Sequence, residues 1–114
     1  MVFYLGIDIG TSASKGVLID DRCNIVCQAS CGHETDNPCD GWYQHDAEAV
    51  WWGDFCRLSR ELVVRSGVNA AQIGCVGLSA LGCDCVPVDT ECNALAPAIL
   101  YGVDARSKPQ IDEL

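Results

Sequence analysis

The 114-residue sequence has few basic side chains and no long uninterrupted run of apolar residues. Seven Lys and Arg residues stand against 16 Asp and Glu residues, which leaves a formal net charge of −9. Nucleic acids and anionic membranes bind concentrated positive charge, so neither is an expected partner. No stretch approaches the roughly 18 apolar residues of a membrane helix. Gly6 and Asp8 interrupt the apolar start and no basic segment precedes it, so we expect no secretory signal and a cytoplasmic protein.

Nine cysteines are present, but the patterns that usually give cysteine a special role are missing. The count is odd and no Cys-x-x-Cys pair occurs, which argues against a disulfide framework and against a zinc site. Cys23, Cys27 and Cys31 recur every four residues, and residues four apart in a strand share a face. We therefore predict reduced thiols that mostly pack as small apolar residues.

Residues 4–20 are typical of a strand, a short polar turn and a second strand. The turn holds Gly10, Thr11 and Ser12, whose backbone amides and hydroxyls can approach an anion. An ordinary hairpin turn prefers the same residue types, so this pattern alone leaves both interpretations open. Asp8 favours the functional one, because a carboxylate in the middle of an apolar strand is costly to bury without a partner.

The hydrophobic patterning predicts one α/β domain. Three strands are expected first, joined by short turns into a meander. A polar loop, which is a candidate mobile segment, leads to an amphipathic crossover helix with Asp46 as its N-cap, and a buried strand and its hairpin partner follow. The expected ranges are strands 2–9, 14–20 and about 25–33, loop 34–41, a helix from 46 to 67, strands 73–79 and 84–88, and a helix begun within 104–114.

The motif Gly6-Ile7-Asp8-Ile9-Gly10-Thr11-Ser12, followed by Lys15, resembles the first phosphate motif of the FGGY carbohydrate kinases. Residues 41–46 leading into Trp51-Trp52, and residues 97–106, agree with that family in order and spacing. The resemblance implies a ribonuclease H-like fold with a mixed sheet, as in sugar kinases, actin and Hsp70-type ATPases. It covers nearly the whole chain but only the opening part of a two-domain enzyme, so we interpret 1–114 as a truncated N-terminal domain without its C-terminal nucleotide clamp.

The resemblance also implies an activity, namely ATP-dependent phosphorylation of a sugar or polyol hydroxyl by a xylulose kinase-like parent enzyme, with ATP and Mg²⁺ as cofactors. Asp8 would be the catalytic-site carboxylate that holds Mg²⁺. The phosphates would contact Gly10, Thr11, Ser12, Ala13 and Lys15. Glycerol kinase has an arginine where Lys15 stands, and a solvated strand lysine is the alternative interpretation. Family members use an aspartate base located beyond residue 114, so the fragment alone is expected to be inactive.

Substrate contacts are where the sequence departs from the named family members. Gly82 and Cys83 stand where glycerol kinase has an Arg-Glu pair and xylulose kinase a Met-His pair, so neither substrate is assured. Asp84 could accept a hydrogen bond from a substrate hydroxyl, or it could face solvent.

Three residues near the end align with an aromatic, an Asp and an Arg of the family's substrate segment. They are Tyr101, Asp104 and Arg106, and the alternative is a surface ion pair. Trp42 would either cover the sugar pocket or anchor its loop. Both histidines, His33 and His45, are expected to be structural and not catalytic.

Three functions from different classes remain open at this stage. They are a truncated kinase domain, a non-catalytic sugar- or nucleotide-binding module, and a structural subunit with the same fold. A domain that normally packs against a second one exposes apolar surface, so a homodimer is a possible assembly.

Overall fold

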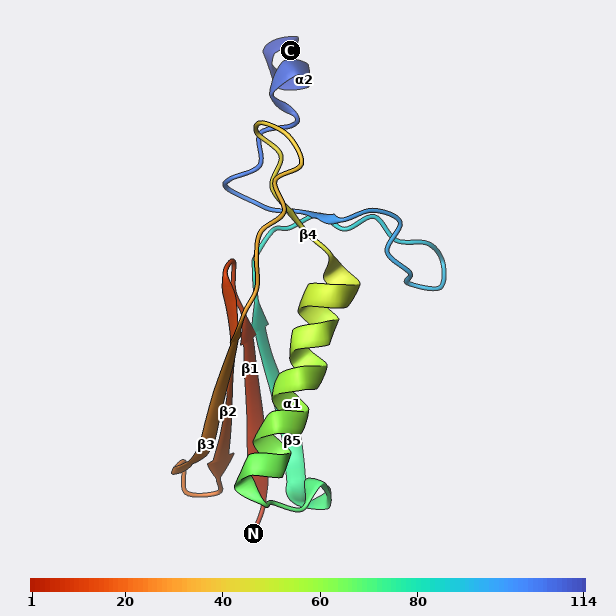
Figure 1. Cartoon of the computed structure of the whole chain (residues 1–114). Coiled ribbons are helices and arrows are strands. Elements are labelled where there is room, and N and C mark those ends of the chain that lie inside the picture. Colours follow the sequence, from red (N-terminus) through yellow and green to blue (C-terminus); the bar gives the residue numbers. More distant parts are fainter.

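A computed structural model describes the chain from residue 1 to residue 114, and its centre is a four-stranded mixed sheet crossed by one long helix (Figure 1). The strand order is β3-β2-β1-β5. The strands β1 (Phe3–Ile9), β2 (Ala13–Asp20) and β3 (Ile25–Gly32) form an antiparallel meander, and β5 (Ile73–Ala80) pairs with β1 in parallel. The expected mixed sheet, with its meander and crossover helix, is confirmed.

The core lies between the sheet and the helix α1 (Gly53–Ser66). Alternate residues of β1 and β2 face the helix, as the two-residue period of a strand requires. Gly16 of β2 permits the close approach, because a Cβ there would lie 2.8 Å from Cδ1 of Leu62. Each large apolar side chain contributes about 1.5–3 kcal/mol on burial, so these contacts hold α1 over β1 and β2. The buried cluster consists of Leu5, Ile7, Ile9, Leu18, Leu58 and Leu62.

The crossover helix begins and ends where the sequence indicates, but its first segment is wider than an α-helix. The Asp46 carboxylate accepts a hydrogen bond from the backbone amide three residues ahead, which confirms the expected N-cap. The segment η1 (Ala47–Trp52) then winds as a π-helix before α1, and Gly67 ends the helix at a φ of 69°. The wide segment carries Trp51, whose indole N–H donates to Nδ1 of His45 at 3.0 Å.

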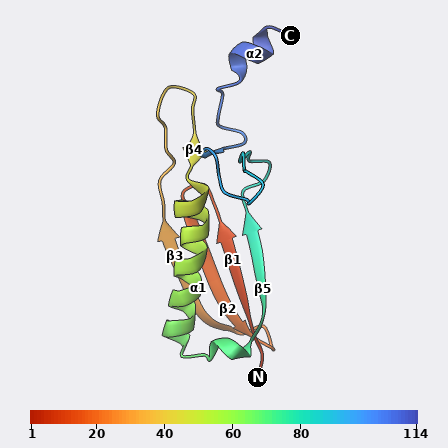
Figure 2. The ribbon, with the colours of Figure 1, turned by 90° about the vertical axis from the view of Figure 1, so that its right-hand side faces the viewer.

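The strand β5 is exposed along most of its length, which corrects the prediction of a buried strand. It is the edge strand of the sheet, and α1 packs on β1, β2 and β3 instead (Figure 2). Val76 is 48% exposed and Leu78 is 62% exposed. The apolar run suggested burial on both faces, but burial depends on what covers the strand, which the run itself does not specify.

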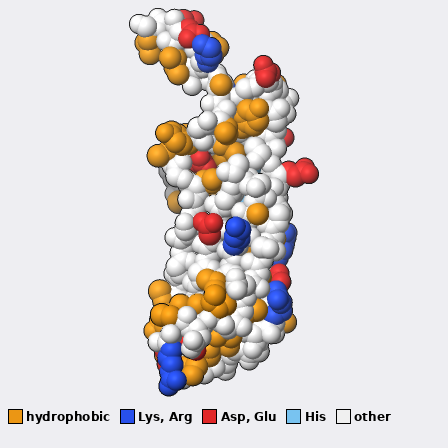
Figure 3. Space-filling model, turned by 90° about the vertical axis from the view of Figure 1, so that its left-hand side faces the viewer, with side chains coloured by type: hydrophobic (Ala, Val, Ile, Leu, Met, Phe, Trp, Pro, Cys, Tyr) orange, Lys and Arg blue, Asp and Glu red, His pale blue; other side chains and the backbone are white.

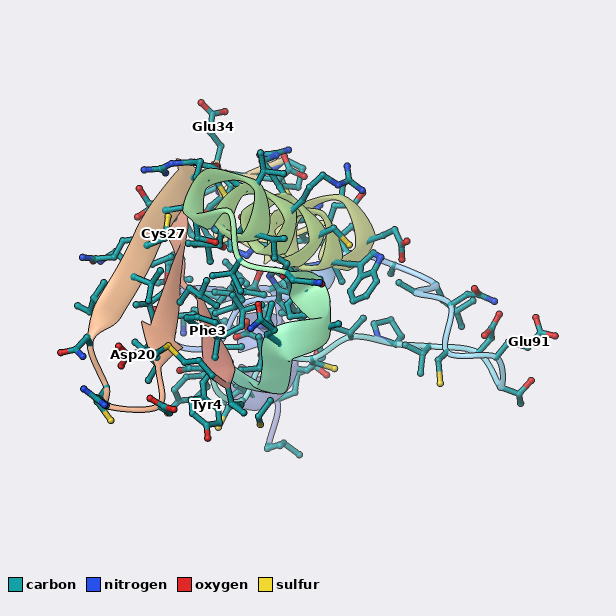
Figure 4. All side chains as sticks on the ribbon, turned by 90° about the horizontal axis from the view of Figure 1, so that it is seen from below. Phe3, Tyr4, Asp20, Cys27, Glu34 and Glu91 are labelled. Carbon is teal, nitrogen blue, oxygen red and sulfur yellow. The ribbon has the colours of Figure 1, made fainter.

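The segment after β5 forms an arm that leaves the sheet, and the second strand expected at 84–88 is wrong. Isolated bridges join Cys85 to Ile99 and Val88 to Ala94. The short strand β6 (Ala98–Ile99) pairs instead with β4 (Gln44–His45). Figure 4, a view from below, shows Glu91 far out on this arm. Residues 84–88 therefore have no neighbouring strand with which to form a longer ladder of backbone hydrogen bonds, and they make only isolated bridges.

Two turns of the chain share one pattern, Asp-x-x-Cys-Asn, at residues 20–24 and 89–93. In each, the Asp carboxylate accepts hydrogen bonds from the amides two and four residues ahead, at 2.9 and 2.8 Å in the first and at 2.9 Å for both in the second. The cysteines Cys23 and Cys92 adopt φ values of 63° and 66°, in the left-handed region. A glycine would enter that region without strain, so these cysteines are conformationally costly.

The cysteines pack less than the sequence analysis predicted. Cys27 and Cys31 do share one side of β3 and pack against the core, and Figure 4 shows Cys27 between β3 and α1. Cys23 lies in the turn before the strand and is not part of that face, which corrects the predicted row of three. Six of the nine are exposed, namely Cys23, Cys39, Cys75, Cys83, Cys85 and Cys92.

The last residues form the short helix α2 (Lys108–Asp112), which confirms the helix expected near the end. A salt bridge of 2.9 Å joins Lys108 to Asp112 across one helical turn. Figure 1 shows α2 at the opposite end of the molecule from the N-terminus. A membrane crossing needs more length and apolarity than any helix here has.

Candidate functional site

The turn between β1 and β2 has its carbonyl groups held by the protein. The Gly10 carbonyl lies 2.8 Å from Nε2 of His33, and the Ser12 carbonyl accepts from the His33 amide at 3.0 Å. The Thr11 carbonyl lies 3.1 Å from Nε2 of His45. Gly10 also donates its amide to the Ala13 carbonyl at 2.9 Å. All three turn carbonyls are therefore engaged.

The donor groups of Thr11 and Ser12 in the same turn are free. Thr11 and Ser12 are exposed, and neither their amides nor their hydroxyls hydrogen-bond within the chain. A Cβ at Gly10 would lie 2.9 Å from the Ala13 carbonyl oxygen, so the turn requires glycine there. Engaged acceptors and free donors make a site that suits an anion such as a phosphate.

Asp8 and Lys15 face each other across β1 and β2, on the side of the sheet away from α1. Both are exposed, which corrects the argument that Asp8 is buried: Leu5, Ile7 and Ile9 face the core, and strand alternation turns Asp8 outward. Neither makes a side-chain hydrogen bond or an ion pair. Together with Ser79 of β5 they line one open hollow.

The space-filling view shows one long face of the molecule (Figure 3). An acidic and a basic side chain lie next to each other at its middle, and apolar side chains gather both above and below them.

A magnesium ion fits the chemistry of Asp8. Mg²⁺ is usually bound by one or two carboxylates together with substrate phosphates and water, and not by a complete protein cage. No group of three or more acidic, His or Cys side chains lies close enough to hold a metal without such help. Asp8 is a free carboxylate two residues before the anion-binding turn, so it could supply the protein ligand.

Behind the turn lies a buried polar network that the sequence analysis missed. The Asp54 carboxylate, at the start of α1, accepts from the Ser14 hydroxyl at 2.7 Å and contacts Nδ1 of His33 at 2.7 Å. Asp54 is 2% exposed and Ser14 is fully buried. Each of these polar residues interrupts an apolar face: Ser14 lies on the apolar face of β2, two residues before Gly16, and Asp54 lies on the apolar stripe of α1. These interruptions are the sequence signal that could have revealed the network.

Electrostatics support a charged carboxylate in this network. Burial raises the pKa of Asp54, but hydrogen bonds from Ser14, His33 and Cys31 outweigh it, and the net pKa lies below the ordinary value. The pKa of His45 is lowered, first by burial and then by the charge of His33. His45 is 1% exposed and hydrogen-bonded on both ring nitrogens, as expected of a structural histidine.

Asp84 does not face solvent, contrary to the alternative weighed from the sequence. Its Oδ1 accepts from the Tyr101 amide at 2.7 Å, and its Oδ2 is buried without any hydrogen-bond partner. A buried carboxylate oxygen without a donor is costly, so a donor from outside the chain would stabilise it. The neighbouring Gly82 and Cys83 are exposed, and Cys83 has a φ of 62°.

Asp104 and Arg106 bind each other and the loop before β4. The Arg106 guanidinium contacts Asp104 at 2.8 Å and lies 4.2 Å from the centre of the Trp42 ring, and Asp104 also accepts from the Tyr43 amide at 2.7 Å. The Arg106 hydrogen bonds, opposed by desolvation, lower the pKa of Asp104 to about 2. The side chains are only 5% and 18% exposed, so this is a partly buried clamp and not a surface ion pair.

One hollow is lined by a residue from each of the two candidate segments, Thr11 from the turn after β1 and Val103 from residues 97–106. Thr35 and Tyr43 complete its lining. Tyr43 is the residue that Asp104 holds through its amide. The fold therefore brings the turn after β1 next to the segment that carries Tyr101, a residue that is 71% exposed.

Comparison with known proteins finds relatives along the whole chain. The profile of the N-terminal domain of the FGGY family of carbohydrate kinases matches residues 3–114. A glycerol kinase of Nostoc sp. is 28% identical over 113 residues, which are 98% of this chain and 22% of that protein.

Solved structures agree with the sequence comparison. A xylulose kinase from Brucella ovis is 32% identical, with a TM-score of 0.87, over 97% of this chain and 23% of the other. Plasmodium falciparum glycerol kinase, solved with ADP, is 26% identical, with a TM-score of 0.82, over 99% of this chain and 22% of the other. The chain thus spans about a fifth of the length of these relatives.

Proposed function

Because the chain belongs to the FGGY family of carbohydrate kinases, we propose that it forms the phosphate- and sugar-facing part of an enzyme that phosphorylates a sugar or polyol with ATP. The observation that carries the proposal is the β1–β2 turn, with its carbonyls engaged and the donors of Thr11 and Ser12 free. The relatives' length supports a longer polypeptide that provides the second half of the nucleotide clamp and the aspartate base.

The proposed reaction joins a substrate hydroxyl oxygen to the γ-phosphorus of ATP and breaks the bond from that phosphorus to the β,γ-bridging oxygen. ADP leaves with the bond electrons, and the hydroxyl proton goes to the base. The amides and hydroxyls of Thr11 and Ser12 and the Lys15 ammonium hold phosphate oxygens, which positions the phosphoryl group and offsets its charge. Asp8 would hold Mg²⁺, which would supply positive charge that neutralises part of the phosphate charge.

On the sugar side, Asp84 is the strongest candidate for a direct contact. Its buried, unpartnered Oδ2 can accept a hydrogen bond from a substrate hydroxyl. The exposed Tyr101 ring can cover an apolar sugar face. Both Asp104 oxygens are already used by Arg106 and Tyr43, so this pair shapes the pocket and leaves substrate contacts to its neighbours.

Two observations bear on the substrate within the family, namely the similarity to a xylulose kinase and the small residues Gly82 and Cys83. Similarity to the Brucella ovis xylulose kinase supports a pentulose. A Cβ at Gly82 would meet nothing within 4 Å, so these residues leave open space where the named family members carry large polar side chains. The pocket would then admit a substrate other than glycerol or xylulose, held chiefly through Asp84.

The test is an ATP-consumption assay of the full-length protein with a panel of pentuloses, pentoses, tetritols and glycerol, with the 114-residue chain alongside. Sugar-dependent turnover by the longer protein, absent from the chain alone and from an Asp8→Asn variant, is the expected result. Turnover by neither the protein nor the chain with any substrate would refute the kinase proposal.

A non-catalytic binding module is the second candidate. The turn is sufficient for this function, because the free donors of Thr11 and Ser12 can bind a phosphate without a second domain. Titration calorimetry with ATP and the same sugars separates the two: binding without turnover in the longest available form of the protein supports the module.

A further inference from the structure

We propose that His33 is the positioning residue of the phosphate turn, and that it acts as a doubly protonated imidazolium clamped between the Asp54 carboxylate and the Gly10 carbonyl. The inference rests on the proposed phosphate-binding function, since it concerns the shape of that same turn.

The protonation state follows from the two partners. Nδ1 of His33 lies 2.7 Å from Asp54 Oδ2, and Nε2 lies 2.8 Å from the Gly10 carbonyl oxygen. A carbonyl oxygen only accepts hydrogen bonds, and so does an ionised carboxylate. Both ring nitrogens must therefore donate, which only the imidazolium can do. The 2.7 Å contact has the length of a charge-assisted hydrogen bond.

The second histidine of the network has the opposite requirement. Nδ1 of His45 accepts from the Trp51 indole N–H, which only donates, so this nitrogen carries no proton. Nε2 of His45 then carries the proton that is donated to the Thr11 carbonyl. The two rings pack edge to face with their centres 5.0 Å apart, and a neutral His45 avoids repulsion between two cations at this distance.

The other charged and titratable groups around the pair agree with this assignment. On α1, Arg57 lies 3.7 Å from the second Asp54 oxygen. On β3, the pKa of Cys31 is raised, first by burial and then by its interaction with the Asp54 carboxylate. From the segment after β5, the Asp84 carboxylate acts to raise the pKa of His45, but burial and the charge of His33 outweigh it, and the net pKa of His45 is lowered. The His33 side chain is only 6% exposed, so solvent does little to weaken its pairing with Asp54.

The consequence for the site is a connection from the helix to the phosphate turn. Asp54 is fixed by Ser14 and by the start of α1, His33 is fixed by Asp54, and His33 fixes Gly10 and Ser12. While both carbonyls are held inward, the amides of the turn stay pointed at the anion. Without a donor at Nε2 the Gly10 carbonyl is free to rotate toward the phosphate, which it would repel.

Two variants separate positioning from simple packing. His33→Phe keeps a buried ring but removes both donors, so the KM for ATP should rise about tenfold, as expected for a lost charge-assisted hydrogen bond, while kcat changes less. Asp54→Asn removes the charge but lets the amide donate to Nδ1, so a neutral His33 can keep its Nε2 proton on Gly10. The KM for ATP should therefore rise less in this variant than in His33→Phe, because the Nε2 donor to Gly10 is kept.

The experiment combines kinetics of the full-length protein with ¹⁵N-histidine spectra at pH 7. The spectra should show two protonated nitrogens for His33 in the wild type and one in Asp54→Asn. Ser59→Ala, which removes one hydrogen bond elsewhere on α1, is the control and should match the wild type.

Each outcome has one meaning. A wild-type KM in His33→Phe, or an unprotonated ring nitrogen in native His33, overturns the positioning proposal and leaves the kinase proposal standing. If His33→Phe does not fold, the spectra of the wild type and of Asp54→Asn still decide. Failure of the wild type to bind ATP in calorimetry overturns the proposed function itself, and the positioning role with it.

Discussion

Substituting Gly16 by alanine tests the packing of α1 on the sheet. The added Cβ would lie 2.8 Å from Leu62 Cδ1 and 3.0 Å from Ile7 Cδ1. Both contacts are flexible chain ends, but Leu62 is fully buried and Ile7 is 2% exposed, so neither has room to move. Overpacking of this kind costs about 1–3 kcal/mol, and the lower entropy of the unfolded alanine chain returns about 0.4–1 kcal/mol. We expect a net loss of about 1–2 kcal/mol.

Urea unfolding followed by circular dichroism measures this loss. With a denaturant slope of about 2 kcal/mol per molar, within the usual range of about 1–3, the midpoint should fall by roughly 0.5–1 M. Gly77→Ala is the matched control, because Gly77 lies in β5 and its Cβ would meet only the Leu5 carbonyl, at 4.0 Å. If Gly16→Ala were as stable as Gly77→Ala, α1 would not pack against β2 at Gly16 as closely as the structure describes.

Three further predictions concern the turns, the metal ligand and the clamp. Cys23→Gly and Cys92→Gly should each stabilise the protein by about 1 kcal/mol, because they remove left-handed strain, and an unchanged melting temperature would contradict this. Asp8→Asn should lower kcat of the full-length enzyme at least about 100-fold while far-ultraviolet circular dichroism stays native, and near-normal turnover would remove Asp8 from the site. The pKa of Asp104 is depressed from 3.8 to about 2, chiefly by Arg106, so its contribution to stability is present above the unfolded value and lost as the pH falls through about 2. Asp104→Asn should therefore unfold more easily than the wild type at pH 5 and almost equally at pH 2, and urea midpoints at both pH values test this.

Local patterns predicted the elements that depend on local forces. The apolar alternation of β1 and β2, the Asp46 cap and the Gly67 terminus are short-range features, so the strands and the helix lie where the sequence indicates. The prediction that the turn at Gly10, Thr11 and Ser12 binds phosphate also rests on local features, since glycine and hydroxyl residues are required within a few positions. Burial was predicted less well, because an apolar run such as β5 does not state what covers it.

The sequence by itself determined the meander, the crossover helix, the acidic character and the membership of a kinase family, because each is written in adjacent residues or in spacing along the chain. Only the tertiary structure decided that Asp8 faces outward and that Asp84 keeps a buried oxygen without a partner. It also joined Asp54 to Gly10 through His33, across 21 and 23 residues of chain. Such contacts depend on how the helix packs on the sheet, and that packing results from many weak interactions summed over the whole core.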